Sequence, residues 1–290
     1  MHSDELRRAF RWACALDVQA RKPGNVSQAS AGHRMQAGLF IASAAAAAGP
    51  LCEHGAAVGE RIERAVRATL AVAHCNTNLG ILLLCAPLAL ACDSWSREQG
   101  LPALRQGLND VLQGLDVADA RAAYRAIAAA QPGGLGDAAQ QDVRAEPTIG
   151  LREAMALAAD RDRIAFQYRH GHADIFELGL PAFVSQAQAT GRGRTAAMQR
   201  CYLEYLAAFP DSHIVRKHGA AAAHSVMAEA LPWRDRSRAG EVLDADPGFA
   251  AWDLELKKSG LNPGTSADFT VAALFIAGLV APRRDFWHGS

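Results

Sequence analysis

Residues 76–92 read NTNLGILLLCAPLALAC, three polar residues followed by an almost unbroken apolar run. At 3.6 residues per turn the run is apolar on nearly every face, which is typical of a helix buried on all sides. Pro87 and the polar start keep it shorter than the roughly 18 apolar residues that a membrane span requires. We therefore predict a central core helix over 77–92.

Two other segments have the same apolar character, one over 36–48 and one over 265–281. Alanine is abundant, β-branched runs are rare, and no segment alternates apolar and polar residues as a half-buried strand does. Further helices are expected over 4–20, 53–73, 97–114, 117–130, 147–168, 173–190, 194–208, 211–230 and 239–258. The sequence thus predicts an all-α protein, a single multi-helix domain over residues 1–290 with buried apolar central helices.

The charge of the chain is balanced, with 30 Lys and Arg residues against 30 Asp and Glu residues in 290. This argues against bulk binding of nucleic acid, which needs a basic face to displace counterions. The charged start at Asp4-Glu5 does not resemble a secretory signal, so we expect a cytoplasmic protein. The six cysteines include no CxxC pair, so buried, reduced thiols are expected rather than a zinc site or disulfides.

Short polar clusters interrupt the apolar helices, and they are the candidate sites of chemistry. The first is the turn Lys22-Pro23-Gly24-Asn25, which follows the first predicted helix. Its lysine and its backbone and side-chain donors suit a phosphate group. The alternative is an ordinary turn in which Lys22 only complements the helix dipole.

The second cluster lies at the start of the predicted core helix and contains Asn76, Thr77 and Gly80. Asn and Thr are ordinary N-cap residues. A helix N-terminus that is buried this deeply also offers free N–H groups and partial positive charge to an anion. Capping and anion binding are compatible, and both stay open.

The third cluster contains Asp174 and Glu177, which are three residues apart and share one helix face. Two carboxylates on one face can bind a divalent cation or move protons. The alternative is a solvated acidic face near a helix start.

The fourth cluster begins with Asp211, an expected N-cap. His213, Arg216 and Lys217 follow at positions that place them in one cationic stripe along the helix. The stripe is either a solvated basic face or a clamp for a polyphosphate.

The fifth cluster opens the last apolar helix and reads GTSAD over 264–268. Thr265 or Ser266 can cap this helix, and Asp268 lies in its first turn, where a carboxylate is favourable. If this helix end is buried, Asp268 needs a cation, a metal or a substrate beside it, because an unpaired buried charge is costly.

In this order and spacing the clusters resemble the triphosphoribosyl-dephospho-CoA synthase family, all-helical enzymes that serve citrate lyase and malonate decarboxylase. Residues 22–24 match the KPG turn of the family, and Asn76-Thr77 with Gly80 matches its NTxxG segment. Residues 264–268 are similar to its GGSAD segment. The resemblance spans nearly the whole chain.

Two segments depart from the citrate-lyase branch of the family. Asn78 and Leu79 stand where that branch has His-Lys, and residues 216–219 stand where it has an Arg-Gly-Gly type of element. The chain is more similar to a divergent branch found in archaea and in bacteria that use methanopterin-type cofactors. The identity of the acceptor therefore stays open.

The resemblance implies that the 5-triphosphoribosyl group of ATP passes to the 2′-hydroxyl of 3′-dephospho-CoA, with release of adenine and with Mg²⁺ beside the triphosphate. It assigns Lys22, Arg216 and Lys217 to phosphate. Further substrate contacts are assigned to Asn25, Asn76, Thr77, Gly80 and Ser266. Candidates for the metal or for the charge that develops on the ribose are Asp174, Glu177 and Asp268, and His213 is the candidate proton carrier. We expect these side chains to line one cavity.

Other functions compatible with the sequence are a related transferase or ligase in one-carbon cofactor synthesis, a nucleosidase with water as acceptor, and a non-catalytic nucleotide-binding protein. The expected partners are small-molecule substrates, with no nucleic acid and no membrane. A homodimer is compatible with the sequence, which does not fix the oligomeric state.

Overall fold

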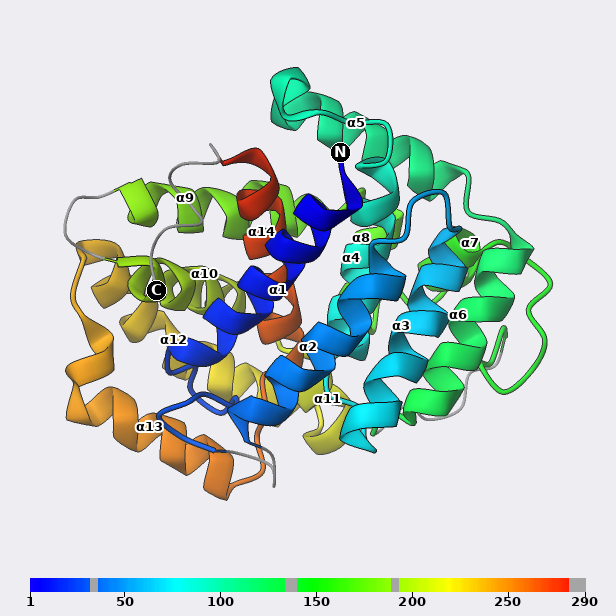
Figure 1. Cartoon of the computed structure of the whole chain (residues 1–290). Helices are drawn as coiled ribbons and strands as arrows, with labels where there is room; N and C mark the ends of the chain where they lie inside the picture. The colour runs from blue at the N-terminus through cyan, green and yellow to red at the C-terminus, as the bar shows by residue number, and fades with distance from the viewer. Residues whose placement is uncertain (32–35, 134–139, 189–192, 282–290) are drawn as a thin grey trace.

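The computed structural model describes residues 1–31, 36–133, 140–188 and 193–281, in which helices form the regular structure and no strand occurs (Figure 1). The helices are α1 (Ser3–Gln19), α2 (Ala37–Leu51), α3 (Val58–Ala73), α4 (Leu79–Ala91), α5 (Gly100–Gln113), α6 (Val117–Ala130), α7 (Leu151–Ala156), α8 (Arg163–Arg169), α9 (Leu180–Gln188), α10 (Gly193–Ala208), α11 (Ser212–His218), α12 (Ala220–Ala239), α13 (Pro247–Lys258) and α14 (Gly264–Val280). Three short 3-10 or π segments complete them: Arg97–Gln99, Ile175–Gly179 and Leu243–Ala245. The predicted all-α fold is confirmed.

Helices α4 and α14 lie at the centre of the molecule, as the sequence predicts. Nearly every side chain of both helices is buried, because neither helix has a polar face to turn toward water. Helix α14 packs against α1, α4 and α10, while α3 packs against α2, α4 and α6 (Figure 1). The two central helices therefore hold their N-terminal turns inside the protein.

Helix α2 differs in two respects from the predicted central helix over 36–48. It packs against α1 and α3 along one face only, and Ile41 on its other face is 41% exposed. Alanine is small enough to lie at the surface at little cost, so an alanine-rich helix need not be buried all round. The helix also continues through Pro50 to Leu51, because the N–H that proline lacks is lost only in the final turn.

Two helices that were predicted as continuous are broken. The segment 147–168 forms α7 and α8, because the Asp162 carboxylate accepts hydrogen bonds from the N–H groups of Ile164 and Ala165 and starts a new helix. The segment 211–230 breaks at Gly219, whose φ of 86° is left-handed and unsuited to a helix interior. The first break places the start of α8 beside the cavity described below, and the second ends α11, which lines the same cavity.

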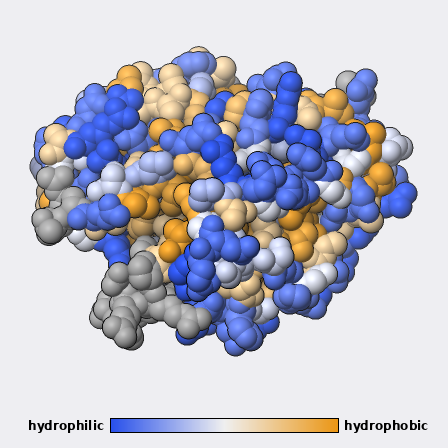
Figure 2. Space-filling model, turned by 90° about the horizontal axis from the view of Figure 1, so that it is seen from above, coloured by the Kyte–Doolittle hydropathy of each residue, from blue (hydrophilic) through white to orange (hydrophobic). Residues whose placement is uncertain are grey.

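Polar and charged side chains cover most of the face seen from above, and hydrophobic residues reach the surface there in patches between them (Figure 2). Within the described ranges no helix has the length and apolarity that a membrane crossing requires. Five of the six cysteines are buried and none forms a disulfide, as predicted; Cys75 is the exception, because its side chain is exposed.

Candidate active site

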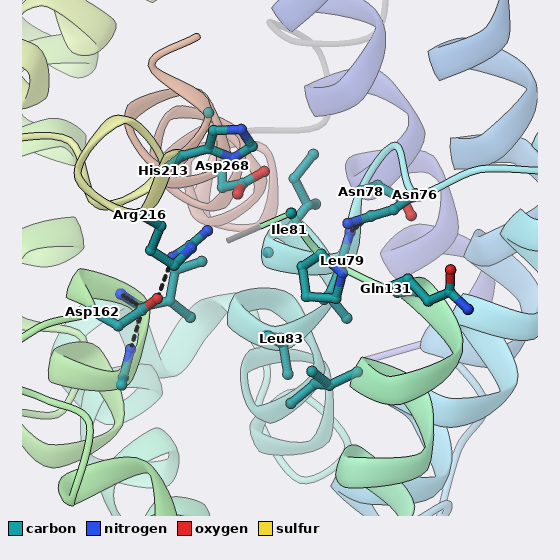
Figure 3. Close-up of a pocket in the computed structure, with 18 of the residues that line it drawn as sticks. Asn76, Asn78, Leu79, Ile81, Leu83, Gln131, Asp162, His213, Arg216 and Asp268 are labelled. Carbon is teal, nitrogen blue, oxygen red and sulfur yellow. Dashed lines mark hydrogen bonds and ion pairs between the residues drawn. The ribbon is translucent and has the colours of Figure 1, made fainter. Parts of the chain in front are cut away.

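A cavity of about 810 Å³ opens between the N-terminal turns of α4, α11 and α14, the end of α6 and the α7–α8 region. Figure 3 shows Arg216 and Asp162 on one side of it, Asn76 and Gln131 on the other, and Asp268 beside His213. Of the predicted site residues, those that line the cavity are Asn25, Asn76, Thr77, Gly80, His213, Arg216, Lys217 and Asp268. The cavity thus brings together predicted site residues up to 243 positions apart in sequence, from Asn25 to Asp268.

The second and fifth clusters of the sequence touch each other at Gly80 and Asp268. A Cβ on Gly80 would overlap the Oδ2 atom of Asp268, so only glycine leaves room for the carboxyl group against the first turn of α4. The partial positive charge of this helix end favours a carboxylate there. Asn76 fixes the same turn, because its Oδ1 accepts a hydrogen bond from the N–H of Leu79 at 3.1 Å. The N-cap position itself is held by Asn78, whose side chain makes no capping bond, so Asn76 stabilises the helix start from outside that position.

The surroundings of Asp268 make it an unusual carboxyl group. Among the described residues none forms a hydrogen bond or a salt bridge with it. Burial raises its pKa well above the ordinary range, and the nearby charges of Asp211 and Asp17 raise the pKa further, against the lowering effect of Arg216 and Lys22. An acid without a partner in a cavity wall is the kind of group that a cation or a developing positive charge would satisfy.

Asp211 joins the starts of α11 and α14 and thereby places His213. Its Oδ1 accepts from the N–H of His213 at 2.9 Å, while its Oδ2 accepts from both the N–H and the hydroxyl of Ser266 at 2.8 Å. The predicted N-cap is confirmed, and one buried carboxylate caps two helices. Ser266 is therefore occupied by Asp211 and does not line the cavity. His213 does line it, packed against Gly264.

Cations gather on the wall formed by α8 and α11. Arg216 forms an ion pair with Asp162, and its Nε has no hydrogen-bond partner within the described ranges. Lys217 and Arg161 also line the cavity, both with exposed side chains and without a carboxylate in salt-bridge range among the residues described. The predicted cationic stripe thus faces the cavity, and Arg161 adds to it.

The KPG turn is arranged differently from the expectation that Lys22 binds phosphate. Lys22 is 0% exposed and does not line the cavity; its ammonium donates to Asp17 and, at 2.9 Å, to Asn25 Oδ1. A buried ammonium must be paired, and Asp17 supplies the countercharge. Gly24 has a φ of 78°, and a Cβ there would lie 2.7 Å from the carbonyl oxygen of Leu261, so the turn needs glycine. Lys22 cannot reach a phosphate in the cavity.

Asp174 and Glu177 are not part of the cavity. Asp174 accepts two hydrogen bonds from the guanidinium of Arg163, at 2.7 and 2.9 Å, and a third from Gln167. Glu177 is 61% exposed at its side chain and pairs with Arg105. Both carboxylates already have guanidinium partners on other helices, so the structure does not bring them to Asp268. In the described part of the chain no group of three or more His, Cys, Asp or Glu residues could hold a metal ion.

Several buried polar atoms around the cavity have no hydrogen-bond partner among the described residues. They are Asp17 Oδ1, Thr77 Oγ1, Asn78 Nδ2 and Arg216 Nε. Such atoms cost about 1–3 kcal/mol each when they stay unpaired, so a bound ligand that satisfies them gains that energy. Asn78 is held by Thr69, whose hydroxyl donates to its Oδ1 at 3.1 Å, and this leaves the amide nitrogen for a ligand.

Sequence reasoning missed Asp17, Asn78, Arg161 and Asp162 as residues of the cavity wall. The N-cap pattern before residues 163–165 could have indicated Asp162. Asn78 lies between Asn76-Thr77 and Gly80, and its polar side chain just before the apolar helix is the signal that could have indicated it. Nothing in the sequence marks Asp17, because it is five positions before Lys22 and a helix ends between the two residues.

Comparison with known proteins assigns the chain to a family. The family model for ATP:dephospho-CoA triphosphoribosyl transferase matches residues 3–285. A crystal structure from Archaeoglobus fulgidus, described as a candidate triphosphoribosyl-dephospho-CoA synthase, is 25% identical over 84% of this chain and 100% of that one, with a TM-score of 0.65. No curated protein matches the sequence. Because the family model covers nearly all of the sequence, the chain belongs to the ATP:dephospho-CoA triphosphoribosyl transferase family.

Proposed function

We propose that the cavity is the active site in which the triphosphoribosyl group of ATP passes to the 2′-hydroxyl of dephospho-CoA and adenine is released. Membership of the family supports the reaction. The contact between Gly80 and Asp268 supports the cavity as the location of the active site. It brings two of the segments that resemble the family together in the wall of one cavity.

The chemistry makes two demands on such a site. The bond between ribose C1′ and adenine breaks, and its electron pair leaves with the base, which takes up a proton. As that bond lengthens, C1′ gains oxocarbenium character, which a carboxylate beside it stabilises. The acceptor hydroxyl forms the new C1′–O bond and loses its proton. Asp268, a carboxyl group that pairs with no cation among the described residues, suits the place beside C1′, and His213 beside it stays the candidate proton carrier.

The cationic wall suits the triphosphate. Arg216 is held by Asp162 and keeps an unpartnered Nε, while Lys217 and Arg161 have no carboxylate partners within the described part of the chain. Guanidinium and ammonium groups placed in this way bind phosphate oxygens through charge-assisted hydrogen bonds. Lys22 has no part in this binding, because it is fully buried behind Asp17.

Mg²⁺ remains part of the proposal. It binds nucleotides through phosphate oxygens and only one or two protein carboxylates, so the absence of a larger ligand cluster from the described residues is compatible with it. Asp268 is the one predicted ligand that lines the cavity, but we assign it to C1′, so phosphate oxygens and water would hold the ion. When bound, the ion would neutralise phosphate charge.

Removal of the two unpaired cations should weaken ATP binding without loss of stability. We expect Lys217→Ala and Arg161→Ala each to raise the KM for ATP about tenfold, since a hydrogen bond to a charged group is worth about 1.5–3 kcal/mol. The melting temperature should stay the same, because neither side chain has a salt-bridge partner among the described residues. Initial-rate kinetics and thermal melts measure both quantities.

Lys258→Ala is the matched control, because Lys258 is an exposed lysine on α13 that does not line the cavity. A KM that rises no more in the two variants than in this control would contradict the assignment of the wall to phosphate.

The reaction itself is tested by incubation of the protein with ATP and dephospho-CoA, followed by chromatographic separation of adenine, ADP and AMP. We expect adenine to appear only when the acceptor is present. Release of ADP or phosphate instead would overturn the proposal in favour of a ligase or an ATPase. Adenine release at the same rate without acceptor would identify a nucleosidase.

A further inference from the structure

Asp17 is a buried carboxylate that nothing in the family motifs assigns. It lies in the last turns of α1, is 6% exposed, and lines the same cavity as Asp268. Its Oδ2 accepts the hydrogen bond from the ammonium of Lys22, while its Oδ1 has no partner among the described residues. One oxygen is thus fixed by a cation, and the other is left for a ligand.

The turn that holds Lys22 is itself tightly anchored. Lys22 also donates to Asn25 Oδ1, and Asn25 donates in turn to Asn262 Oδ1 at 2.8 Å. The hydroxyl of Tyr202 donates to the carbonyl of Pro23 at 2.7 Å, and the N–H of Gly24 donates to a buried carboxylate of α13 at 3.0 Å. With so many fixed partners the ammonium has little freedom, so the turn acts as a rigid clamp on Asp17.

The two carboxyl groups of the cavity have different surroundings. Asp17 touches a cation, whereas Asp268 forms no ion pair with any residue that the structure describes. Burial raises the pKa of Asp17, but the charge and hydrogen bond of Lys22 act in the opposite direction and favour the carboxylate. In enzymes, two titratable groups in unlike surroundings commonly divide the roles of base and acid or charge stabiliser. The carboxylate that contacts a fixed cation is the one suited to accept a proton.

We propose that Asp17 is the general base that takes the proton from the acceptor hydroxyl, and that Lys22 is a positioning residue that holds its carboxylate. This rests on the proposed function. In the step the O–H bond of the acceptor breaks and its proton passes to Asp17 Oδ1, while the hydroxyl oxygen forms the bond to C1′. The electron pair of the C1′–N bond leaves with adenine, which takes a proton that His213 passes on from water, and Asp17 returns its own proton to water afterwards.

The first test compares Asp17→Asn with Asp93→Asn. Asp93 is a matched control: its Oδ2 pairs with the fully buried Arg61 at 2.6 Å, its Oδ1 is likewise unpartnered within the described ranges, and it does not line the cavity. Both variants lose a similar buried ion pair, so we expect similar falls in melting temperature. Only Asp17→Asn should lose turnover, about a hundredfold or more, with the KM for ATP little changed, because general base catalysis contributes 10²–10⁴-fold.

The second test supplies a nucleophile that needs no base. Azide attacks C1′ without loss of a proton, so azide should restore adenine release by Asp17→Ala in the absence of dephospho-CoA, and triphosphoribosyl azide should form. Mass spectrometry of the product identifies it. Loss of turnover in Asp17→Ala that azide does not restore, while ATP still binds, would overturn the base assignment, as would turnover in Asp17→Asn equal to that of Asp93→Asn.

The role of Lys22 has its own readout. Lys22→Gln keeps a donor for Asp17 but removes the positive charge, so the pKa of the base should rise and the acidic limb of the kcat/KM profile should move to higher pH. The charge of Asp17 in turn raises the pKa of four neighbouring groups, which are Cys14, Cys201, Tyr202 and Asp268. An unmoved acidic limb in Lys22→Gln would contradict the positioning role.

These outcomes are separate from failure of the proposed function. If the wild-type protein releases no adenine with any acceptor, the function is wrong. If it does release adenine and Asp17→Asn behaves like the control, only the assignment of Asp17 is wrong.

Discussion

Replacement of Asp268 by Asn is expected to lower turnover about a hundredfold or more, the scale of a lost electrostatic contact in a transition state. Asn keeps the shape of the side chain beside Gly80 but cannot ionise, so no carboxylate can form beside the developing charge that we assign to C1′. The KM for ATP should change much less than kcat, because the charge on C1′ develops only during the reaction. Steady-state kinetics of adenine release measure both constants.

The same substitution should raise the melting temperature at neutral pH. The pKa of Asp268 is higher in the folded protein than in the unfolded chain, because burial raises it. The folded state therefore binds more protons, and its stability falls as the pH rises above the ordinary pKa of a carboxyl group. Asn has no proton to lose and avoids this penalty. A lower melting temperature with unchanged activity per folded molecule would show that Asp268 is structural.

Asp174→Asn is the control for this experiment. Asp174, like Asp268, is predicted from the sequence as a catalytic or metal-binding carboxylate. In the structure, however, it is paired with Arg163 outside the cavity. We expect its turnover to stay close to that of the wild type while its stability falls, the opposite of Asp268→Asn. A loss of turnover of equal size in both variants would mean that the cavity does not define the site.

Gly80→Ala is expected to have the second large effect, although it adds only a methyl group. That methyl would overlap Oδ2 of Asp268, so the carboxyl group must move away from the first turn of α4. Displacement of a catalytic group by about 1 Å can cost about a hundredfold in rate. Turnover should fall accordingly, whereas helix propensity by itself favours Ala over Gly by about 1 kcal/mol.

A double-mutant cycle separates this effect from general damage. In an Asp268→Ala background Gly80→Ala should cost little further activity, since the group that it displaces is already gone. Gly107→Ala is the control, because Gly107 lies in α5 and an added Cβ would approach no atom closer than 3.8 Å. Fully additive losses at positions 80 and 268 would contradict the contact as the cause.

The parts of the fold that could be predicted are those for which local pattern and burial agree. The all-round apolar character of α4 and α14 requires burial, and this placed both helices at the centre. The alanine-rich α2 is as apolar in sequence as α4 and α14, but its side chains are small. One face of it can therefore lie in water at little cost. The helix break at Asp162 was not predicted. One oxygen of its carboxylate caps α8 and the other pairs with Arg216, a partner that only the tertiary fold brings near.

The candidate site could be predicted where a motif includes its own glycine or cap, as in Gly80, Asp211 and Asp268. The site could not be predicted where the partner of a side chain is distant in sequence. Asp174 and Lys22 look alike in sequence as exposed charges at helix ends, yet each is neutralised by a neighbour that only the fold supplies. The charge of a residue therefore does not tell whether its side chain lines the cavity or is paired with another residue outside it.

The central claim, that one cavity moves the triphosphoribosyl group from ATP to an acceptor hydroxyl, is tested most directly by the mass of the acceptor after reaction. We expect dephospho-CoA to gain the mass of a triphosphoribosyl group in the same amount as adenine is released. Its 2′-deoxy analogue, which lacks the nucleophile, should gain nothing and release no adenine. Equal adenine release with the two acceptors, or an acceptor that gains phosphate or adenylate instead, would contradict the account.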